Sequence, residues 1–257
     1  MNVVIFAGPT LSASEGARVL DATYLPPAAQ GDLYRAARGK PVAIGLIDGY
    51  FERVPSVSHK EILWAMKQGV HVFGAASMGA LRAAELAAFG MEGVGEIFQA
   101  FASGALEDDD EVAVVHADAE DGYRPFSEAM VNLRATLHAA RAAGILDEDT
   151  RSTLESFAKG LFHADRSWPA LFQRAQEAGL DSAGLAAFRR FVTEHRVDQK
   201  RLDSLALLHT LRARVEAGLP PKETRYAFSH TDAWEHILRT IEIALDPGRE
   251  GRGATSS

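Results

Sequence analysis

The sequence contains no cysteine among its 257 residues. Disulfide bonds, a thiolate nucleophile and cysteine-ligated metal or iron–sulfur centres are therefore excluded. No apolar run approaches the roughly 20 residues that a helix needs to cross a bilayer. Met1 leads directly into the apolar run 3–6, without the basic residues that begin a signal peptide. We expect a soluble, cytoplasmic protein with no membrane contact.

Positive charge is also scarce. Lys and Arg number 27 against 35 Asp and Glu, the formal net charge is −8 at pH 7, and no basic stripe offsets it. Nucleic-acid binding depends largely on contacts with phosphate, so we expect no nucleic-acid partner. The acids include the uninterrupted run 107–111, which could hold a hard cation, although such runs are more often solvated loops that cap helices.

The first half of the chain repeats a strand, a loop and a helix. Short apolar runs at 3–6, 42–47 and 70–73 are typical of buried parallel strands, and each is followed by small or polar residues and then by a helical pattern. A short edge strand is expected near 24–27, and a further strand at 112–115. These units predict an α/β fold with a parallel sheet.

The second half has a helical pattern almost throughout. Helices are expected at 128–143, 149–159, 169–179, 185–194, 198–218 and 232–245. We therefore predict an α/β core over residues 1–120, an α-helical region over 121–246 and a disordered tail over 247–257.

In a parallel sheet, the loops that follow the strands gather at one edge, and ligands bind there. The turn at Gly8, the acid Asp48 and the residues after 70–73 each follow a predicted strand. We expect Gly8, Asp48 and Ser77 to lie along this edge.

The stretch 75–79 reads Ala-Ala-Ser-Met-Gly between a predicted strand and a predicted helix. This is a relaxed form of the Gly-x-Ser-x-Gly elbow, which presents a serine nucleophile over the positive end of a helix. Serine is also a preferred N-cap, and this is where an N-cap lies. Ala80 replaces the Glu or Gln of a capping box, which weighs only slightly against a cap. The spacing leaves both interpretations of Ser77 open.

A serine nucleophile needs a base, and Lys60 and His59 are the candidates closest in sequence to the expected edge. A lysine can serve only when burial or a nearby positive charge lowers its pKa from about 10.4 to about 7 or 8. Spacing alone favours Lys60 as a surface residue paired with an acid and His59 as a partly buried residue of the wall. The turn at Gly8 lacks the Lys-Ser/Thr of a phosphate loop, but its N–H groups could donate to an oxyanion.

Several motifs together resemble the TfuA family over the first half of the chain and on to about residue 138. They are 6–10 (FAGPT), 48–51 (DGYF), 59–64 (HKEILW), 74–86 (GAASMGALRAAEL), 121–124 (DGYR) and 127–130 (SEAM). The resemblance implies a partner of a YcaO enzyme, which installs thioamides in a peptide substrate. It further implies cleavage of a thiocarboxylated ThiS-like sulfur carrier, with release of sulfide. No cofactor and no metal are expected.

The family is described as having a Ser-Lys pair, which the matching motifs carry onto Ser77 and Lys60. The resemblance then implies that Lys60 deprotonates Ser77 and that the Met78 N–H, with a donor from the loop Gly8 to Thr10, holds the oxyanion. Asp48 and His59 are expected as supporting residues. Two rivals remain: an adaptor that binds YcaO to its peptide, with Ser77 only capping a helix, and a general serine esterase.

Overall fold

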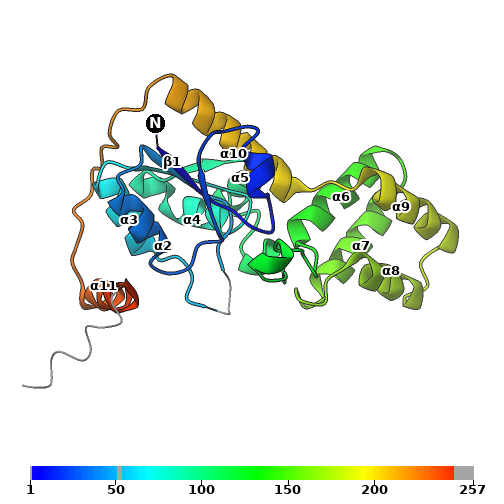
Figure 1. The fold of residues 1–257 in the computed structure, drawn as a ribbon. Coiled ribbons are helices and arrows are strands. Elements are labelled where there is room, and N and C mark those ends of the chain that lie inside the picture. The colour runs from blue at the N-terminus through cyan, green and yellow to red at the C-terminus, as the bar shows by residue number, and fades with distance from the viewer. Residues whose placement is uncertain (1, 51–53, 246–257) are drawn as a thin grey trace, which may run out of the picture.

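The computed structural model describes residues 2–50 and 54–245. A five-stranded, all-parallel sheet forms its centre (Figure 1), in the spatial order β2-β1-β3-β4-β5. The strands are β1 (Val3–Phe6), β2 (Thr23–Leu25), β3 (Ala43–Leu46), β4 (His71–Ala75) and β5 (Glu92–Val94). The α/β class is confirmed. The chain reverses direction across the sheet between β1 and β3, and sheets of this order bind ligands at the carboxyl edge beside that point.

Helices cover both faces of the sheet because successive strand residues point to opposite sides. Val4 and Phe6 pack with α2, α3 and α4, whereas Val3 and Ile5 pack with Leu207 of α10. Figure 1 shows α10 on one side of the sheet and α2 and α3 on the other. The helices of this unit are α1 (Ala13–Gly16), α2 (Asp32–Arg38), α3 (His59–Lys67), α4 (Met78–Leu86), α5 (Glu96–Ala102) and α10 (Gln199–Glu216).

The predicted helical region divides into three parts: a bundle, α10 and a last helix over 232–245. A bundle beside the sheet (Figure 1) has its own apolar core. It consists of α6 (Met130–Ala142), α7 (Glu148–Lys159), α8 (Trp168–Glu177) and α9 (Ser182–His195). The long α10 instead returns to the sheet, because Leu207, Leu208 and Leu211 are buried in the core that faces β1 and β3.

One predicted strand is absent from the structure, and one strand of the sheet was not predicted. Residues 112–115 form no strand, because Val112 packs among residues of α4, α5 and α6 and the N–H of Val115 donates to Ser127 Oγ rather than to a neighbouring strand. The unpredicted strand is β5, which forms the edge of the sheet beside β4. Its short sequence, Glu-Gly-Val, lacks the apolar run that indicates a buried strand. Between these elements lie short 3-10 turns at Ala87–Phe89, Asp109–Glu111 and Ala119–Asp121.

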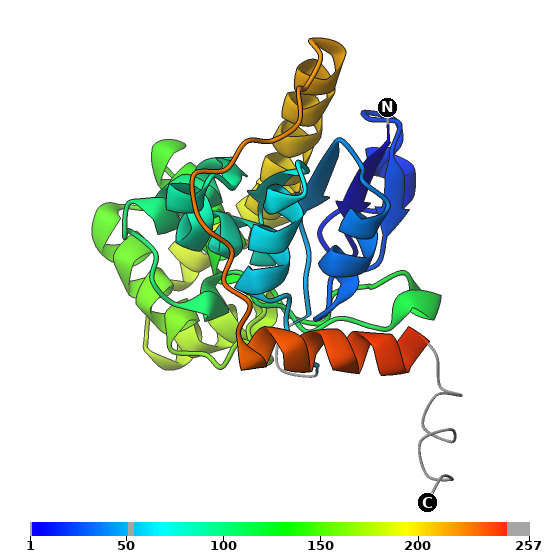
Figure 2. The same ribbon diagram turned by 90° about the vertical axis from the view of Figure 1, so that its left-hand side faces the viewer.

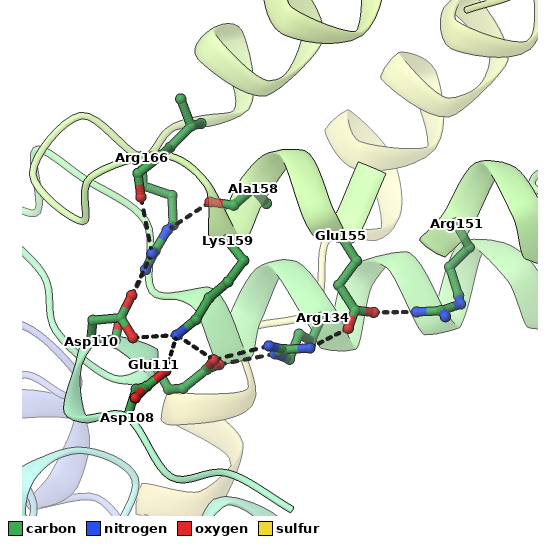
Figure 3. Close-up of polar contacts among 10 residues, drawn as sticks. Asp108, Asp110, Glu111, Arg134, Arg151, Glu155, Ala158, Lys159 and Arg166 are labelled. Atoms are coloured by element: carbon green, nitrogen blue, oxygen red, sulfur yellow. Dashed lines mark hydrogen bonds and ion pairs between the residues drawn. The ribbon is translucent and has the colours of Figure 1, made fainter. Parts of the chain in front are cut away.

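The acidic run 107–111 is solvated in its first part, where residues 107–109 are exposed, but its last two acids, Asp110 and Glu111, form an ion-paired junction (Figure 3). Arg166 is fully buried and donates to Asp110 Oδ2 at 2.7 Å and to the Asp110 carbonyl at 3.0 Å. Arg134 holds Glu111 through two bonds of 2.9 Å, and Lys159 contacts both acids. Burial raises the pKa of Asp110, but Lys159 and Arg166 outweigh it and lower that pKa overall. These ion pairs join the loop after α5 to the bundle.

The chain after α10 runs back along the α/β unit and ends in α11 (Asp232–Leu245), which lies across the ends of α2 and α3 (Figure 2). Trp234 is buried against Tyr34 and Trp64. At the β5 edge of the sheet, Glu92 accepts a hydrogen bond from Lys222 Nζ at 3.2 Å. The predicted tail 247–257 lies outside the described residues. In the part of the chain that the structure describes, no helix has the length and apolar character to cross a membrane.

Replacing Arg166 with Met removes one of the three cations of the acidic junction, while Lys159 still pairs with Asp110. We expect a loss of about 1–3 kcal/mol in the free energy of unfolding, because the carbonyls of Ala158, Asp110 and Leu161 lose a donor. Urea unfolding followed by circular dichroism measures this. The matched control Arg190→Met, at an exposed position on α9, should stay within about 0.5 kcal/mol of the wild type.

Glu92 predicts a pH dependence of stability. Burial raises the pKa of its carboxyl, but the hydrogen bond with His71 and the charges of Lys222 and Arg214 prevail and lower the pKa from 4.5 to about 2. The stabilisation is therefore complete above pH 4.5 and is lost as the pH falls towards 2. Glu92→Gln should cost about 1 kcal/mol at pH 7, after allowance for solvent screening.

Thermal unfolding of Glu92→Gln at pH 7 and pH 3 checks this, with the exposed Glu223→Gln as control. The deficit of the variant should shrink at pH 3. An equal deficit at both pH values would contradict the assigned pKa.

Candidate active site

A cavity of about 450 Å³ opens at the carboxyl edge of the sheet. A second hollow of about 510 Å³ adjoins it through shared lining residues Val54, Ala113 and His163 and continues along α4. The first cavity is lined by Pro9, Ala29, Asp48, Gly49, Tyr50, Val54, Ser77, Ala113, Val114, Val115, His116, Asp118 and His163. Two of the predicted site residues, Asp48 and Ser77, therefore face one cavity.

Ser77 follows a strained turn at the end of β4. Its N–H donates to the Ala75 carbonyl at 2.8 Å, and the residue between them, Ala76, has φ of 66°. This is a γ-turn of the rare form with a positive φ at its centre. Ser77 itself lies at the N-cap of α4 with φ of −120° and ψ of −128°, yet its side chain makes no capping hydrogen bond. Ser77 is only 3% exposed, and within residues 2–50 and 54–245 its hydroxyl has no hydrogen-bond partner.

Two glycines permit this turn. A Cβ on Gly74 would overlap the Gly79 carbonyl, and a Cβ on Gly79 would overlap the Leu46 carbonyl. The start of α4 therefore lies directly against β3 and β4, and the Gly79 N–H donates to the Ile47 carbonyl at 3.2 Å. The Met78 N–H, at the first position of the helix, has no acceptor among the described residues and remains available to an anion.

Asp48 binds the loop after β1. Its Oδ2 accepts from the N–H groups of Gly8 at 2.9 Å and Thr10 at 3.0 Å, and its Oδ1 accepts from Thr10 Oγ1 at 2.5 Å. The sequence predicted that this loop would donate to an oxyanion. In the structure both of these N–H groups are taken by Asp48, which is 1% exposed. Asp48 thus supports the site by fixing the loop after β1.

Lys60 and His59 begin α3 but do not line the cavity. Lys60 Nζ donates to the Ser229 carbonyl at 2.8 Å and lies 5.0 Å from the centre of the Phe228 ring. His59 Nε2 contacts Glu85 Oε2 at 2.8 Å, and its side chain is 46% exposed. No hydrogen bond joins Lys60 to Ser77 in the described part of the chain. The structure thus does not bring the predicted pair together.

A different lysine lies at this edge. Lys200, near the start of α10, is 4% exposed, and its Nζ donates to the Val112 carbonyl at 2.8 Å. Burial lowers the pKa of its ammonium, and the opposing charges of Asp48, Asp198 and Glu128 do not cancel this effect. Sequence reasoning missed it, although a signal existed: Lys200 precedes Ser204, Leu207, Leu208 and Leu211 at the spacing of the buried stripe of α10.

His116 is a second group in the cavity that sequence reasoning missed. Its Nδ1 lies 2.7 Å from the Ala117 carbonyl, an acceptor, so Nδ1 carries the hydrogen. In the neutral ring, Nε2 is then left as a hydrogen-bond acceptor. The imidazole lies beside the rings of Tyr50 and Tyr123, at 6.1 and 5.7 Å between centres. Burial and the contact with Tyr50 raise the pKa of Tyr123.

Together these groups form a site for nucleophilic chemistry on an anionic or carbonyl-containing substrate. As far as the described residues go, it offers a hydroxyl without a hydrogen-bond partner, an N–H without an acceptor at a helix N-terminus, and acidic and basic side chains such as Asp48 and His116. Within residues 2–50 and 54–245, no cluster of three or more His, Asp or Glu side chains could hold a metal ion.

Comparison with known proteins gives one result that bears on identity. No curated protein matches the chain. Residues 48–167 match the family model described as TfuA-like protein, and they contain Asp48, Ser77 and His116. This family is associated with YcaO-dependent thioamidation. The match confirms the resemblance found in the motifs: residues 48–167 of this chain form a TfuA-like region.

Proposed function

We propose that the protein is an accessory hydrolase of YcaO-dependent peptide thioamidation, which cleaves a thiocarboxylated ThiS-like sulfur carrier and releases sulfide. The supporting observation is the Ser77 hydroxyl, which occupies an N-cap position without capping the helix and faces the cavity. A serine kept for structure at this position would bond the N–H groups of the first turn. This one leaves its oxygen available for a reacting carbon.

The shape of the site fits a chain terminus as substrate. A cavity of about 450 Å³ holds a few residues but no folded protein. The adjoining hollow along α4 extends the path for an extended segment. A carrier whose thiocarboxylate is at the end of a flexible tail could reach Ser77 while its folded part stays outside.

The reaction then proceeds in two steps. A base removes the Ser77 proton, and Oγ bonds to the thiocarboxylate carbon. The oxyanion of this intermediate lies within reach of the Met78 N–H and of the positive end of α4. The C–S bond breaks, and sulfur leaves as hydrosulfide with the proton that the base had taken. Water hydrolyses the resulting ester and restores both the serine and a carboxylate on the carrier.

The identity of the base is a separate matter. The resemblance assigns this role to Lys60, and His59 is its neighbour in the motif. For Lys60 to act, its amine must leave the Ser229 carbonyl and the Phe228 ring and turn to the cavity.

A second candidate function, an adaptor for YcaO and its peptide, is favoured by exposed apolar groups around the cavity. Phe162 is 62% exposed and directly precedes the lining residue His163, and Val54, another lining residue, is 42% exposed. Exposed apolar side chains that cluster on a surface are typical of protein contacts. An adaptor needs this surface but not the Ser77 hydroxyl.

Ser77→Ala should reduce sulfide release from a thiocarboxylated carrier by about 1,000-fold or more, because the nucleophile is lost. Sulfide is measured with purified protein and carrier, in the absence of YcaO. Ser103→Ala, at an exposed position on the far end of α5, is the matched control and should keep full activity. Release by Ser77→Ala at the wild-type rate would refute the hydrolase.

Phe162→Ala separates the adaptor from the hydrolase. In a reconstituted assay with YcaO and its peptide, an adaptor loses thioamide formation in Phe162→Ala and keeps it in Ser77→Ala. The proposed hydrolase shows the opposite result for Ser77→Ala when the carrier is the sulfur source, and addition of free sulfide should restore thioamide formation in that variant.

A further inference from the structure

We propose that the imidazole of His116 activates the water that hydrolyses the ester formed on Ser77. This inference rests on the proposed function and deepens it, because it assigns a group to the second step of the same reaction. It follows from where the segment 113–118 places the ring and from which ring nitrogen can accept a proton.

The two steps of the reaction make different demands. In the first step the departing sulfur is a weak base, so the C–S bond breaks without a strong acid. In the second step the attacking group is water, whose pKa in bulk solution is about 15.7. As the water oxygen bonds to the ester carbon, its proton passes to a base. The C–Oγ bond then breaks, the proton returns to Oγ, and the carboxylic acid on the carrier ionises. This step therefore needs a proton acceptor that water can reach.

His116 lies on another wall of the cavity that Ser77 lines. The loop after β3 joins the two walls. At one end of this loop, a Cβ on Gly49 would lie 2.8 Å from Met78 Cγ, next to Ser77. At the other end, the ring centre of Tyr50 lies 6.1 Å from that of His116. The cavity of about 450 Å³ leaves room for an acyl group and a water molecule between the two walls.

The ring of His116 is in a form that can accept a proton. Its Nδ1 lies 2.7 Å from the Ala117 carbonyl, so the hydrogen is on Nδ1 and the lone pair is on Nε2. No hydrogen bond from the described residues occupies Nε2. His116 is half-buried, whereas Ser77 is almost fully buried. Solvent water can therefore reach the imidazole at the cavity wall.

The backbone on both sides of His116 is held in place. The Val115 N–H donates to Ser127 Oγ at 2.9 Å, and the Ala117 N–H donates to the Arg124 carbonyl at 2.9 Å. The hydrogen bond from Nδ1 adds a third restraint, on the ring itself. A base that is already oriented loses little freedom when the water binds, which favours the reaction.

The other titratable groups around the ring are less suited to this step. They are Asp48, Tyr50, Asp118 and His163 of the cavity lining, and Tyr123, whose ring faces His116. Asp48 already accepts three hydrogen bonds from the loop after β1. A carboxylate such as that of Asp118 is a weaker base than an imidazole, and a phenol keeps its proton at neutral pH. His163 packs beside Phe162, where the two hollows meet.

The test separates the two steps, using the full chain and the thiocarboxylated carrier. His116→Gln keeps a polar side chain at the wall but cannot take a proton from water. Its first turnover should release one sulfide per protein molecule, and sulfide release should then slow about 100-fold or more. The carrier should stay attached to Ser77 as an ester. Denaturing electrophoresis at acidic pH detects this adduct, and mass spectrometry assigns it to Ser77.

A matched control and chemical rescue separate a base from a structural residue. His195→Gln changes an exposed histidine at the end of α9, and it should keep wild-type sulfide release without a lasting adduct. In His116→Ala, added imidazole should restore turnover and remove the adduct, increasingly as the pH rises, because only neutral imidazole accepts a proton. A purely structural histidine would show no such rescue. Circular dichroism of each variant establishes that it is folded.

Each outcome has a distinct meaning. Turnover of His116→Gln at the wild-type rate overturns the assignment of His116, and so does loss of the first turnover together with the later ones. An adduct that accumulates in His163→Gln instead gives the step to His163 and also overturns the assignment. In all these cases the hydrolase stands if Ser77→Ala releases no sulfide. Unchanged sulfide release by Ser77→Ala removes the hydrolase itself, whatever the histidine variants show.

Discussion

The contact between β4 and α4 is the constraint on which the site depends. Gly74 and Gly79 bring the start of the helix against the strands so closely that no Cβ fits at either position. The chain must therefore turn within two residues, and the positive φ of Ala76 is the strain that results. The same turn leaves Ser77 at the N-cap of α4 with a side chain that makes no capping hydrogen bond. Ser77 lines the cavity next to Met78, whose N–H has no acceptor among the described residues.

The surroundings of each charged group decide what it can do at this edge. Asp48 is buried but satisfied by three donors from the loop after β1, so it acts as a structural anchor. Lys60 and Lys200 are chemically identical, yet one meets a carbonyl and a ring at the surface while the other is withdrawn from water.

The acidic junction connects the two halves of the molecule. Its acids pair with Arg134, Lys159 and Arg166 of the bundle (Figure 3), and the chain that leaves it, 113–118, forms a wall of the cavity. The bundle therefore contributes to the site indirectly, by fixing the segment that carries His116. Within this run of acids, the two least exposed, Asp110 and Glu111, are the ones whose ion pairs fix the wall.

The sequence alone determined the parallel βα units, the helices of the second half, and the common edge at which Asp48 and Ser77 lie, because periodicity and the rule for parallel strands are local properties. Only the tertiary structure decided that 112–115 is a loop, that α10 returns to the sheet, and that the Gly8 and Thr10 N–H groups serve Asp48. It also decided which lysine is buried away from solvent, Lys200. Desolvation and hydrogen bonding depend on residues that lie far apart in the chain, such as Asp48 and Lys200, and no local pattern specifies how such residues meet.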